Sequence, residues 1–164
     1  MKSVIVENMD SIGLGRIRKE FDSWHFFTNR NVQEAPSTTG VYVIRQANGL
    51  RIGRLKAESD ILYIGSTTSK GGLRQRLMQY FHPGPTQWTN QRLNSFLKKY
   101  AMEVAWCPCS EPTNLEHDLL REYLMDHDEL PPFNHADVRR LYKTLGDSVT
   151  LSDKVTVIKT PGKV

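Results

Sequence analysis

Two short strings of residues contain side chains whose types and spacing suit chemistry. Gly40-Val41-Tyr42 and Tyr63-Ile64-Gly65 each combine a tyrosine with a glycine, and Arg76, Glu116 and Asn134 follow along the chain. An arginine can hold a phosphate and stabilise the charge that develops on it. A carboxylate can bind a divalent cation, and a tyrosine hydroxyl can orient an attacking water or relay its proton. The set therefore suits metal-assisted cleavage of a phosphodiester.

Glu116 lies on the apolar side of a helix that we expect over residues 113–127. At about 100° per residue, Glu116 falls near the middle of an apolar stripe. The other members of the stripe are Leu115, Leu119, Leu120, Tyr123 and Leu124. A carboxylate in this position is costly unless it is paired, hydrogen-bonded or bound to a metal. Thr113-Asn114-Leu115-Glu116 also fits a capping box, in which the glutamate bonds back to the amide of the cap residue.

The two tyrosines have a structural alternative as well. Tyr42 and Tyr63 lie one on each strand of a predicted hairpin, where aromatic residues commonly pack across the sheet. The functional interpretation comes from the neighbouring glycines. Gly40 and Gly65 have no side chain, so a substrate backbone could come close to either tyrosine.

Arg76 and Asn134 are open to two interpretations each. Arg76 lies on the flank of a predicted amphipathic helix, with Tyr80 at i,i+4 spacing. It is either a solvated side chain or a planar fork that holds a phosphate. Asn134 ends Pro131-Pro132-Phe133-Asn134 and is either an ordinary turn residue, or a functional group that donates to a phosphate or positions a neighbour.

The elements that must position these residues follow from periodicity and turn signals. We expect a loop at 36–40, a long basic hairpin connection at 46–60 with a turn at Asn48-Gly49, and one or two short helices within 9–30. The remaining elements are strands at 41–45, 61–65 and 102–106, helices at 71–81, 89–100, 113–127 and 138–145, and a last short strand at 155–158. This order predicts an α+β fold with a small, mainly antiparallel sheet covered by helices.

Composition limits the class of protein. The chain has 164 residues, of which 24% are charged, and this suits one soluble globular domain with a sizeable core. No apolar run approaches membrane-spanning length and no signal-peptide pattern follows Met1, so we expect a cytoplasmic protein. Cys107 and Cys109 are too close for an easy disulfide, and we expect reduced thiols. A zinc site with two of the histidines is the alternative.

Charge is distributed unevenly along the chain. Residues 36–100 hold ten Lys/Arg and two Asp/Glu, whereas residues 101–137 hold one and nine. The basic part suits a polyanionic partner. The acidic part could hold a divalent cation or be a solvated helix face. Within 46–60, Arg51, Arg54 and Lys56 are either contacts to DNA phosphates or part of a solvated hairpin tip.

Together these residues resemble the GIY-YIG nuclease family. The two signatures are Gly40-Val41-Tyr42 and Tyr63-Ile64-Gly65-Ser66, where Ser66 stands at a position that is a lysine in some members. The segment GLRQRLMQYF at 72–81 is similar to the family's arginine helix, LEHDLL at 115–120 to its glutamate helix, and PPFN at 131–134 to its closing motif. The resemblance covers 36–136 of a single 1–164 domain, with extensions at 1–35 and 137–164.

The resemblance implies a three-stranded antiparallel sheet flanked by helices and a DNA endonuclease that uses one divalent cation, Mg²⁺ or Mn²⁺. Glu116 would bind the metal, and Arg76 would stabilise the pentavalent transition state. Asn134 would support the site.

Three tyrosines receive roles from the same resemblance. Tyr42 would orient or deprotonate the attacking water, Tyr63 would act on the phosphate or exchange that role, and Tyr80 would lie near the scissile phosphate. A free tyrosine has a pKa of about 10 and is a poor base at neutral pH. Nearby positive charge would have to lower the pKa of Tyr42, unless Tyr42 only relays the proton.

The layout favours a compact stand-alone nuclease that acts on double-stranded or structured DNA. It is either a restriction-type enzyme, which would work as a homodimer, or a repair or recombination nuclease. The competing class is a catalytically inactive nucleic-acid-binding module with the same fold.

Overall fold

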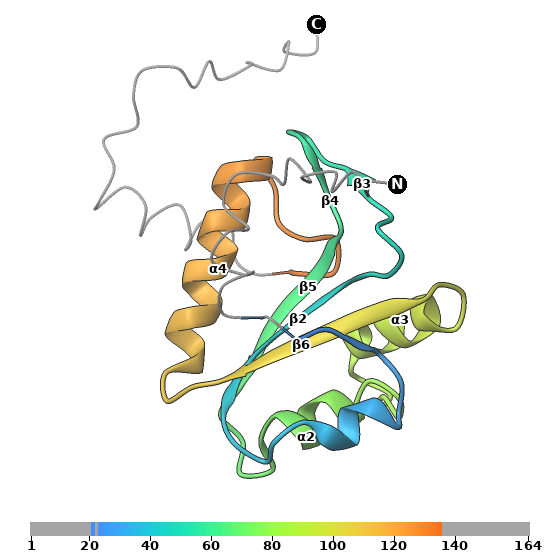
Figure 1. The fold of residues 1–164 in the computed structure, drawn as a ribbon, viewed down its shortest axis with the longest axis vertical. Coiled ribbons are helices and arrows are strands. Elements are labelled where there is room, and N and C mark those ends of the chain that lie inside the picture. The colour runs from blue at the N-terminus through green and yellow to red at the C-terminus, as the bar shows by residue number, and fades with distance from the viewer. Residues whose placement is uncertain (1–20, 22, 136–164) are drawn as a thin grey trace, which may run out of the picture.

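The computed structural model describes residues 21 and 23–135 and has an α+β architecture, as predicted. Its main sheet is antiparallel, with the strand order β1-β6-β2-β5. These strands are β1 (His25–Phe26), β2 (Gly40–Gln46), β5 (Ile61–Thr67) and β6 (Met102–Pro108). A second sheet pairs β3 (Ile52–Gly53) with β4 (Glu58–Ser59). The helices are the 3₁₀-helix η1 (Asn31–Glu34), α2 (Gly72–Met78), α3 (Trp88–Leu97) and α4 (Pro112–His127) (Figure 1).

The prediction of a three-stranded sheet was wrong, because β1 adds a fourth strand. His25 pairs with Val104 and Phe26 with Glu103, and the His25 ring stacks on Trp106 with centroids 4.5 Å apart. Residues 23–30 contain this strand instead of the helix that we expected there. Residues 9–20 and 22, the helix predicted at 138–145 and the strand predicted at 155–158 lie outside the described residues.

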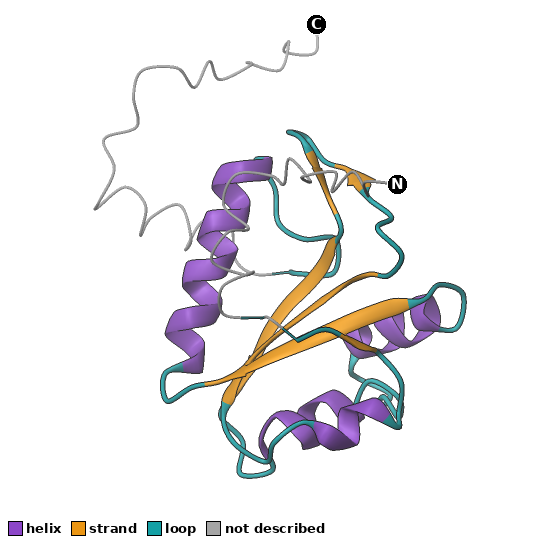
Figure 2. Ribbon diagram, in the orientation of Figure 1, coloured by secondary structure: helices purple, strands orange, loops and turns teal. Residues whose placement is uncertain are grey.

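Helices cover both faces of the main sheet (Figure 2). The side chains of β2 are divided between the two faces of the sheet, because successive residues of a strand point to opposite faces. Val41 and Val43 pack in the core beneath α4, whereas Tyr42 and Ile44 pack in the core beneath α2 and α3. Each of these four side chains is fully buried. No helix in the described part of the chain is long and apolar enough to cross a membrane.

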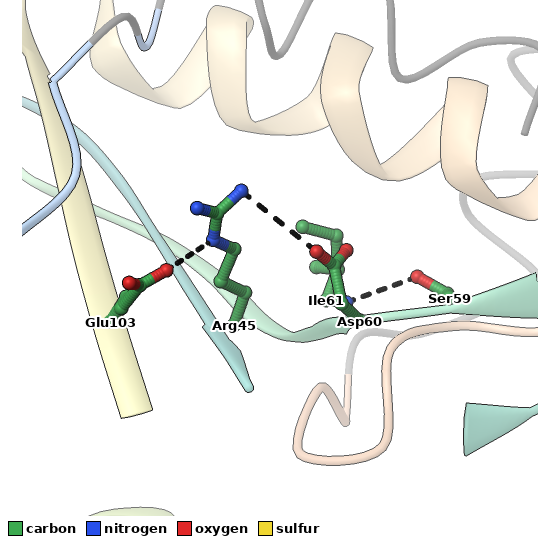
Figure 3. A network of polar contacts seen from close by, with 5 residues as sticks. All are labelled: Arg45, Ser59, Asp60, Ile61 and Glu103. Carbon is green, nitrogen blue, oxygen red and sulfur yellow. Dashed lines mark hydrogen bonds and ion pairs between the residues drawn. The ribbon is translucent and has the colours of Figure 1, made fainter. Parts of the chain in front are cut away.

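An ion-pair network ties three elements together near one end of the sheet (Figure 3). Arg45 of β2 donates from Nε to Glu103 Oε2 of β6 at 2.7 Å, and its Nη1 lies 3.9 Å from Asp60 Oδ2, just before β5. The Arg45 guanidinium also lies 3.8 Å from the centre of the Trp24 ring. The pairing of β2 with β5 shifts register between Ile44 and Arg45, so the network fixes the strands where the ladder is irregular.

The connection at 46–60 is a hairpin, as predicted, with positive φ angles at Asn48 and Gly49. It folds back onto the C-terminal end of α4. Arg54 donates from Nη2 to the carbonyl of Leu130 at 2.6 Å and pairs with Glu129 at 3.0 Å. The Arg54 side chain is only 9% exposed, so it serves the fold and does not offer a free cation to DNA. Arg51 and Lys56 are exposed.

The loop before β2 fixes the start of α2. Gly72 has a φ of +62°, and a Cβ there would lie 2.3 Å from the Thr38 amide nitrogen. Leu73 N–H donates to the carbonyl of Thr38 at 2.9 Å, and Arg74 N–H to that of Pro36 at 3.1 Å. These bonds satisfy amides that a helix start otherwise leaves without partners, and they set the direction of α2.

Replacement of Gly72 by alanine should destabilise the fold by more than about 2 kcal/mol, because a left-handed φ costs an alanine roughly 1–2 kcal/mol before any collision. Gly49→Ala is the matched control. Gly49 has a φ of +67°, but no atom lies within 4 Å of the place that a Cβ would occupy, so it should lose only the conformational part. Urea unfolding of both variants measures the difference. Equal losses would mean that Thr38 moves aside and the close approach is not restrictive.

Candidate active site

Three tyrosines from three segments meet on the face of the sheet that α2 covers. Tyr42 comes from β2, Tyr63 from β5, and Tyr80 follows α2; their ring centroids are 6.0, 6.1 and 6.2 Å apart. The hydroxyls of Tyr42 and Tyr80 share a hydrogen bond of 2.6 Å. Tyr42 and Tyr80 are fully buried, whereas Tyr63 is partly exposed. Of the three, Tyr63 is therefore the one that a ligand could reach without moving the others.

Arg76 joins this cluster from α2. Its Nε donates to the Tyr42 hydroxyl at 3.2 Å, and its Nη1 donates to Gln79 Oε1 at 3.0 Å. The guanidinium carbon lies 5.3 Å from the centre of the Tyr80 ring, within the range of a cation–π contact. The fork is thus held on two sides by side chains, which fixes its orientation before any ligand binds.

The chemistry of Tyr42 follows from its burial. Burial raises the pKa of the Tyr42 hydroxyl, the nearby Tyr63 raises it further, and these effects outweigh the opposing influence of Arg76 and of the hydrogen bonds. The pKa of Tyr80 is also raised, mainly by burial. Both hydroxyls are therefore protonated at neutral pH. In this arrangement Tyr42 suits proton relay and the positioning of Arg76 better than it suits the role of a general base.

The two signature glycines make room for the protein's own atoms. A Cβ at Gly65 would lie 2.6 Å from the Tyr42 hydroxyl oxygen and 2.6 Å from Cε1 of Tyr63. A Cβ at Gly40 would lie 2.5 Å from the Cys107 carbonyl oxygen, and the position is buried. The expectation that the glycines admit a substrate backbone was wrong. They permit the close packing of the tyrosines and of β2 against β6.

Glu116 does not form the capping box. The α4 helix begins at Pro112, after Glu111 as the N-cap, and no side-chain hydrogen bond caps it. Proline suits the first helical position. Thr113 therefore lies inside the helix. Glu116 instead accepts a hydrogen bond from the Ser66 hydroxyl of β5. Sequence reasoning noted Ser66 only as a variable position, because a contact across 50 residues leaves no local signal.

The environment of Glu116 is partly apolar and electrostatically linked to the arginine. Burial raises the pKa of the Glu116 carboxyl above its ordinary value, and the Ser66 hydroxyl, His117 and Arg76 oppose this rise. The pKa of Glu116 is thus sensitive to the charge of Arg76 in the tyrosine–arginine cluster.

The donor set near Glu116 fits magnesium. Mg²⁺ is commonly bound by one or two carboxylates together with water and substrate phosphates. Among the described residues no group of three or more His, Cys, Asp or Glu side chains gathers in one place, which is unlike a closed zinc site. Cys107 and Cys109 are free of disulfide bonds, as predicted. One partly buried carboxylate that is sensitive to the charge of Arg76 is thus consistent with a cation that is shared with a substrate.

Asn134 supports the sheet and lies apart from the tyrosine hydroxyls. Its Oδ1 accepts from the Ile64 amide at 3.0 Å and its Nδ2 donates to the Ile64 carbonyl at 2.8 Å. Phe133 N–H donates to the Leu62 carbonyl at 3.1 Å. The Asn134 side-chain amide and the Phe133 backbone therefore bind the edge of β5 much as another strand would, at Ile64 and at Leu62 on either side of Tyr63. Of the interpretations left open by the sequence, the geometry favours the positioning of a neighbour.

Comparison with models of protein families, with curated proteins and with solved structures found no match. The resemblance to GIY-YIG nucleases stays a hypothesis that depends on the residues themselves.

The raised pKa of Glu116 predicts a pH-dependent effect of Glu116→Gln on stability. Because the folded state favours the protonated carboxyl, the wild-type group contributes its full stability below pH 4.5 and loses it as the pH rises through the folded value. The neutral glutamine avoids this loss, so Glu116→Gln should be more stable than the wild type at pH 7, with a difference that shrinks towards pH 4.5. Urea unfolding across this range measures it. A variant that is less stable at every pH would show that Glu116 has a purely structural role.

Proposed function

We propose that this protein is a metal-dependent DNA endonuclease of the GIY-YIG type. The observation that supports it is the arrangement around Arg76. A guanidinium held by the Tyr42 hydroxyl lies beside partly exposed Tyr63 and within electrostatic reach of the Glu116 carboxylate. A cation-binding carboxylate, a phosphate-binding fork and a phenol are the parts that hydrolysis of a phosphodiester needs.

In this proposal each side chain has one task. Glu116 holds Mg²⁺ or Mn²⁺, which when bound polarises a phosphoryl oxygen and helps the leaving oxygen depart. Arg76 binds the phosphate and stabilises its charge in the transition state. Tyr63, which is partly exposed, orients the attacking water or the phosphate. Tyr42 and Tyr80 are buried and fix the direction of Arg76. Asn134 holds the strand that contains Tyr63.

The substrate in this proposal is double-stranded or structured DNA. Exposed cations such as Arg51 and Lys56 suit contacts to phosphates. A restriction-type homodimer and a repair or recombination nuclease both fit the site.

One observation favours a second candidate, a DNA-binding module without hydrolysis. The Tyr42 hydroxyl, to which the resemblance gives the attacking water, is fully buried and its pKa is raised, so in this conformation it is a poor base for that water.

Cleavage of supercoiled plasmid in Mg²⁺, with an EDTA control, separates these candidates. Glu116→Gln should abolish cleavage while DNA binding in EDTA is retained. Arg76→Lys should lower the single-turnover rate by about 10²-fold or more, because lysine lacks the planar fork. Glu111→Gln is the control, since this carboxylate is exposed at the start of the same helix. Binding without cleavage by the wild type would support the binding module, and normal cleavage by Glu116→Gln would refute the proposed site.

Phenylalanine substitutions separate the roles of Tyr63 and Tyr42. Tyr63→Phe should keep the stability of the wild type and lower turnover strongly, because only its partly exposed hydroxyl is removed. Tyr42→Phe should also destabilise the fold by about 1–3 kcal/mol, since it leaves the buried Tyr80 hydroxyl and Arg76 Nε without this partner. Urea unfolding and single-turnover cleavage are measured on both. Normal cleavage by Tyr63→Phe would assign the water to another group.

A further inference from the structure

A cavity of about 770 Å³ opens outside the candidate active site. It lies between β1, the C-terminal end of α3 and the segment that follows α2, and we call it the aromatic groove. Phe26, Phe27, Phe81 and Tyr100 line it together with Lys98 and Lys99. Its size falls within the range of ligand-binding pockets, about 300–1,000 Å³.

Two aromatic side chains of the groove, Phe26 and Tyr100, are accessible, and Tyr100 and Phe81 are supported by neighbouring rings. Phe26 and Tyr100 are 53% and 51% exposed. Large aromatic side chains are usually buried to a greater extent. Tyr100 rests on Phe96 with centroids 4.5 Å apart, and Phe81 lies edge-on to Phe27 at 5.2 Å. Rings held in this way can receive a flat ligand without first being ordered, which lowers the entropic cost of binding.

The charge of the groove has one sign. Lys98, Lys99 and His82 are exposed on its wall, and none of the described residues that line it is acidic. Thr28 and Asn29 add polar groups beside Phe26. Lysines next to open aromatic rings match a ligand that combines phosphates with flat bases, because the lysines attract the backbone and the rings stack on the bases.

We propose that the aromatic groove binds single-stranded nucleic acid. Bases in a duplex are already stacked on their neighbours and offer no free face to Phe26 or Tyr100. An unpaired base does offer one, and stacking on an aromatic side chain is strong and tolerant of sequence. The lysines on the wall track the phosphates of the same strand. The groove is therefore a second nucleic-acid site, distinct from the group of residues around Arg76.

The groove adjoins the tyrosine cluster through Tyr80. Asn94, on the wall of the groove, donates from Nδ2 to the Tyr80 carbonyl at 2.8 Å, and Phe27 lies edge-on to the Tyr80 ring at 5.9 Å. Binding in the groove does not require hydrolysis. Where the proposed nuclease activity also holds, the substrate is DNA with an unpaired segment, such as an overhang, a flap or a loop.

Fluorescence anisotropy in EDTA tests the groove without cleavage. The probes are a labelled oligothymidylate of about 12 nucleotides, within the span that one domain commonly covers, and a hairpin duplex of equal charge. The wild type should bind the single strand, and the hairpin duplex reports any binding that needs no unpaired base. Phe26→Ala combined with Tyr100→Ala should weaken it by about 10- to 100-fold. Trp88→Ala is the matched control, since this side chain is 73% exposed but lies outside the groove, and it should bind normally.

A second variant keeps the test valid if the aromatic variant folds poorly. Lys98→Gln combined with Lys99→Gln changes two exposed side chains and should reduce the salt dependence of single-strand binding by about 0.7 log unit for each phosphate that the variant no longer neutralises. Lys70→Gln, also exposed and outside the groove, should leave it unchanged. An oligouridylate probe shows whether DNA or RNA is preferred.

Equal binding of the single strand by the aromatic variant and the Trp88→Ala control in folded protein overturns the proposal. So does an unchanged salt slope in the lysine variant. Failure of the nuclease proposal appears separately, as absent plasmid cleavage by the wild type, because the groove is measured in EDTA and its variants change no residue of the Arg76 site.

Discussion

The hydrogen bonds at the Tyr42 hydroxyl are the constraint on which the rest of the site depends. This buried oxygen is hydrogen-bonded to the Tyr80 hydroxyl and accepts from Arg76, so it joins the central strand β2 to the helix α2 and to the segment after it. A buried hydroxyl without partners is costly, and here every partner is itself a candidate site residue. The atoms that pack this part of the fold are therefore also atoms of the candidate site. Residue 65 must be a glycine for the tyrosine rings to approach one another.

The elements with strong local signals were predictable. Runs of β-branched and aromatic residues marked β2 and β5, and period-3.6 patterns marked α2, α3 and α4 to within a few residues. The two-residue strand β1 was not, because such a short strand has no pattern of its own and depends on pairing with β6. The start of α4 had a usable signal, Pro112 at the first helical position, which the capping-box interpretation overlooked.

The candidate site was predictable in its members and only partly in its contacts. Tyr42, Tyr63, Tyr80 and Arg76 do come together, and Glu116 lies within electrostatic reach of Arg76. The hydrogen bond from Ser66 to Glu116, the burial of Tyr42 and the inward packing of Gly40 and Gly65 depend on how distant segments meet, which residue types alone do not encode. The candidate site residues thus fall into two groups. Tyr63 is partly exposed, whereas Tyr42 and Tyr80 are buried and pack against their neighbours.

The amide of Asn134 has a consequence for assembly. β5 is the outer strand of the main sheet, and an open outer strand is a template on which a second chain can add its own strand. Asn134 and Phe133 occupy the backbone groups of Ile64 and Leu62 on that edge. The segment that contains them blocks sheet-to-sheet joining at these positions. Two copies of this chain therefore cannot join their sheets through these backbone groups of β5.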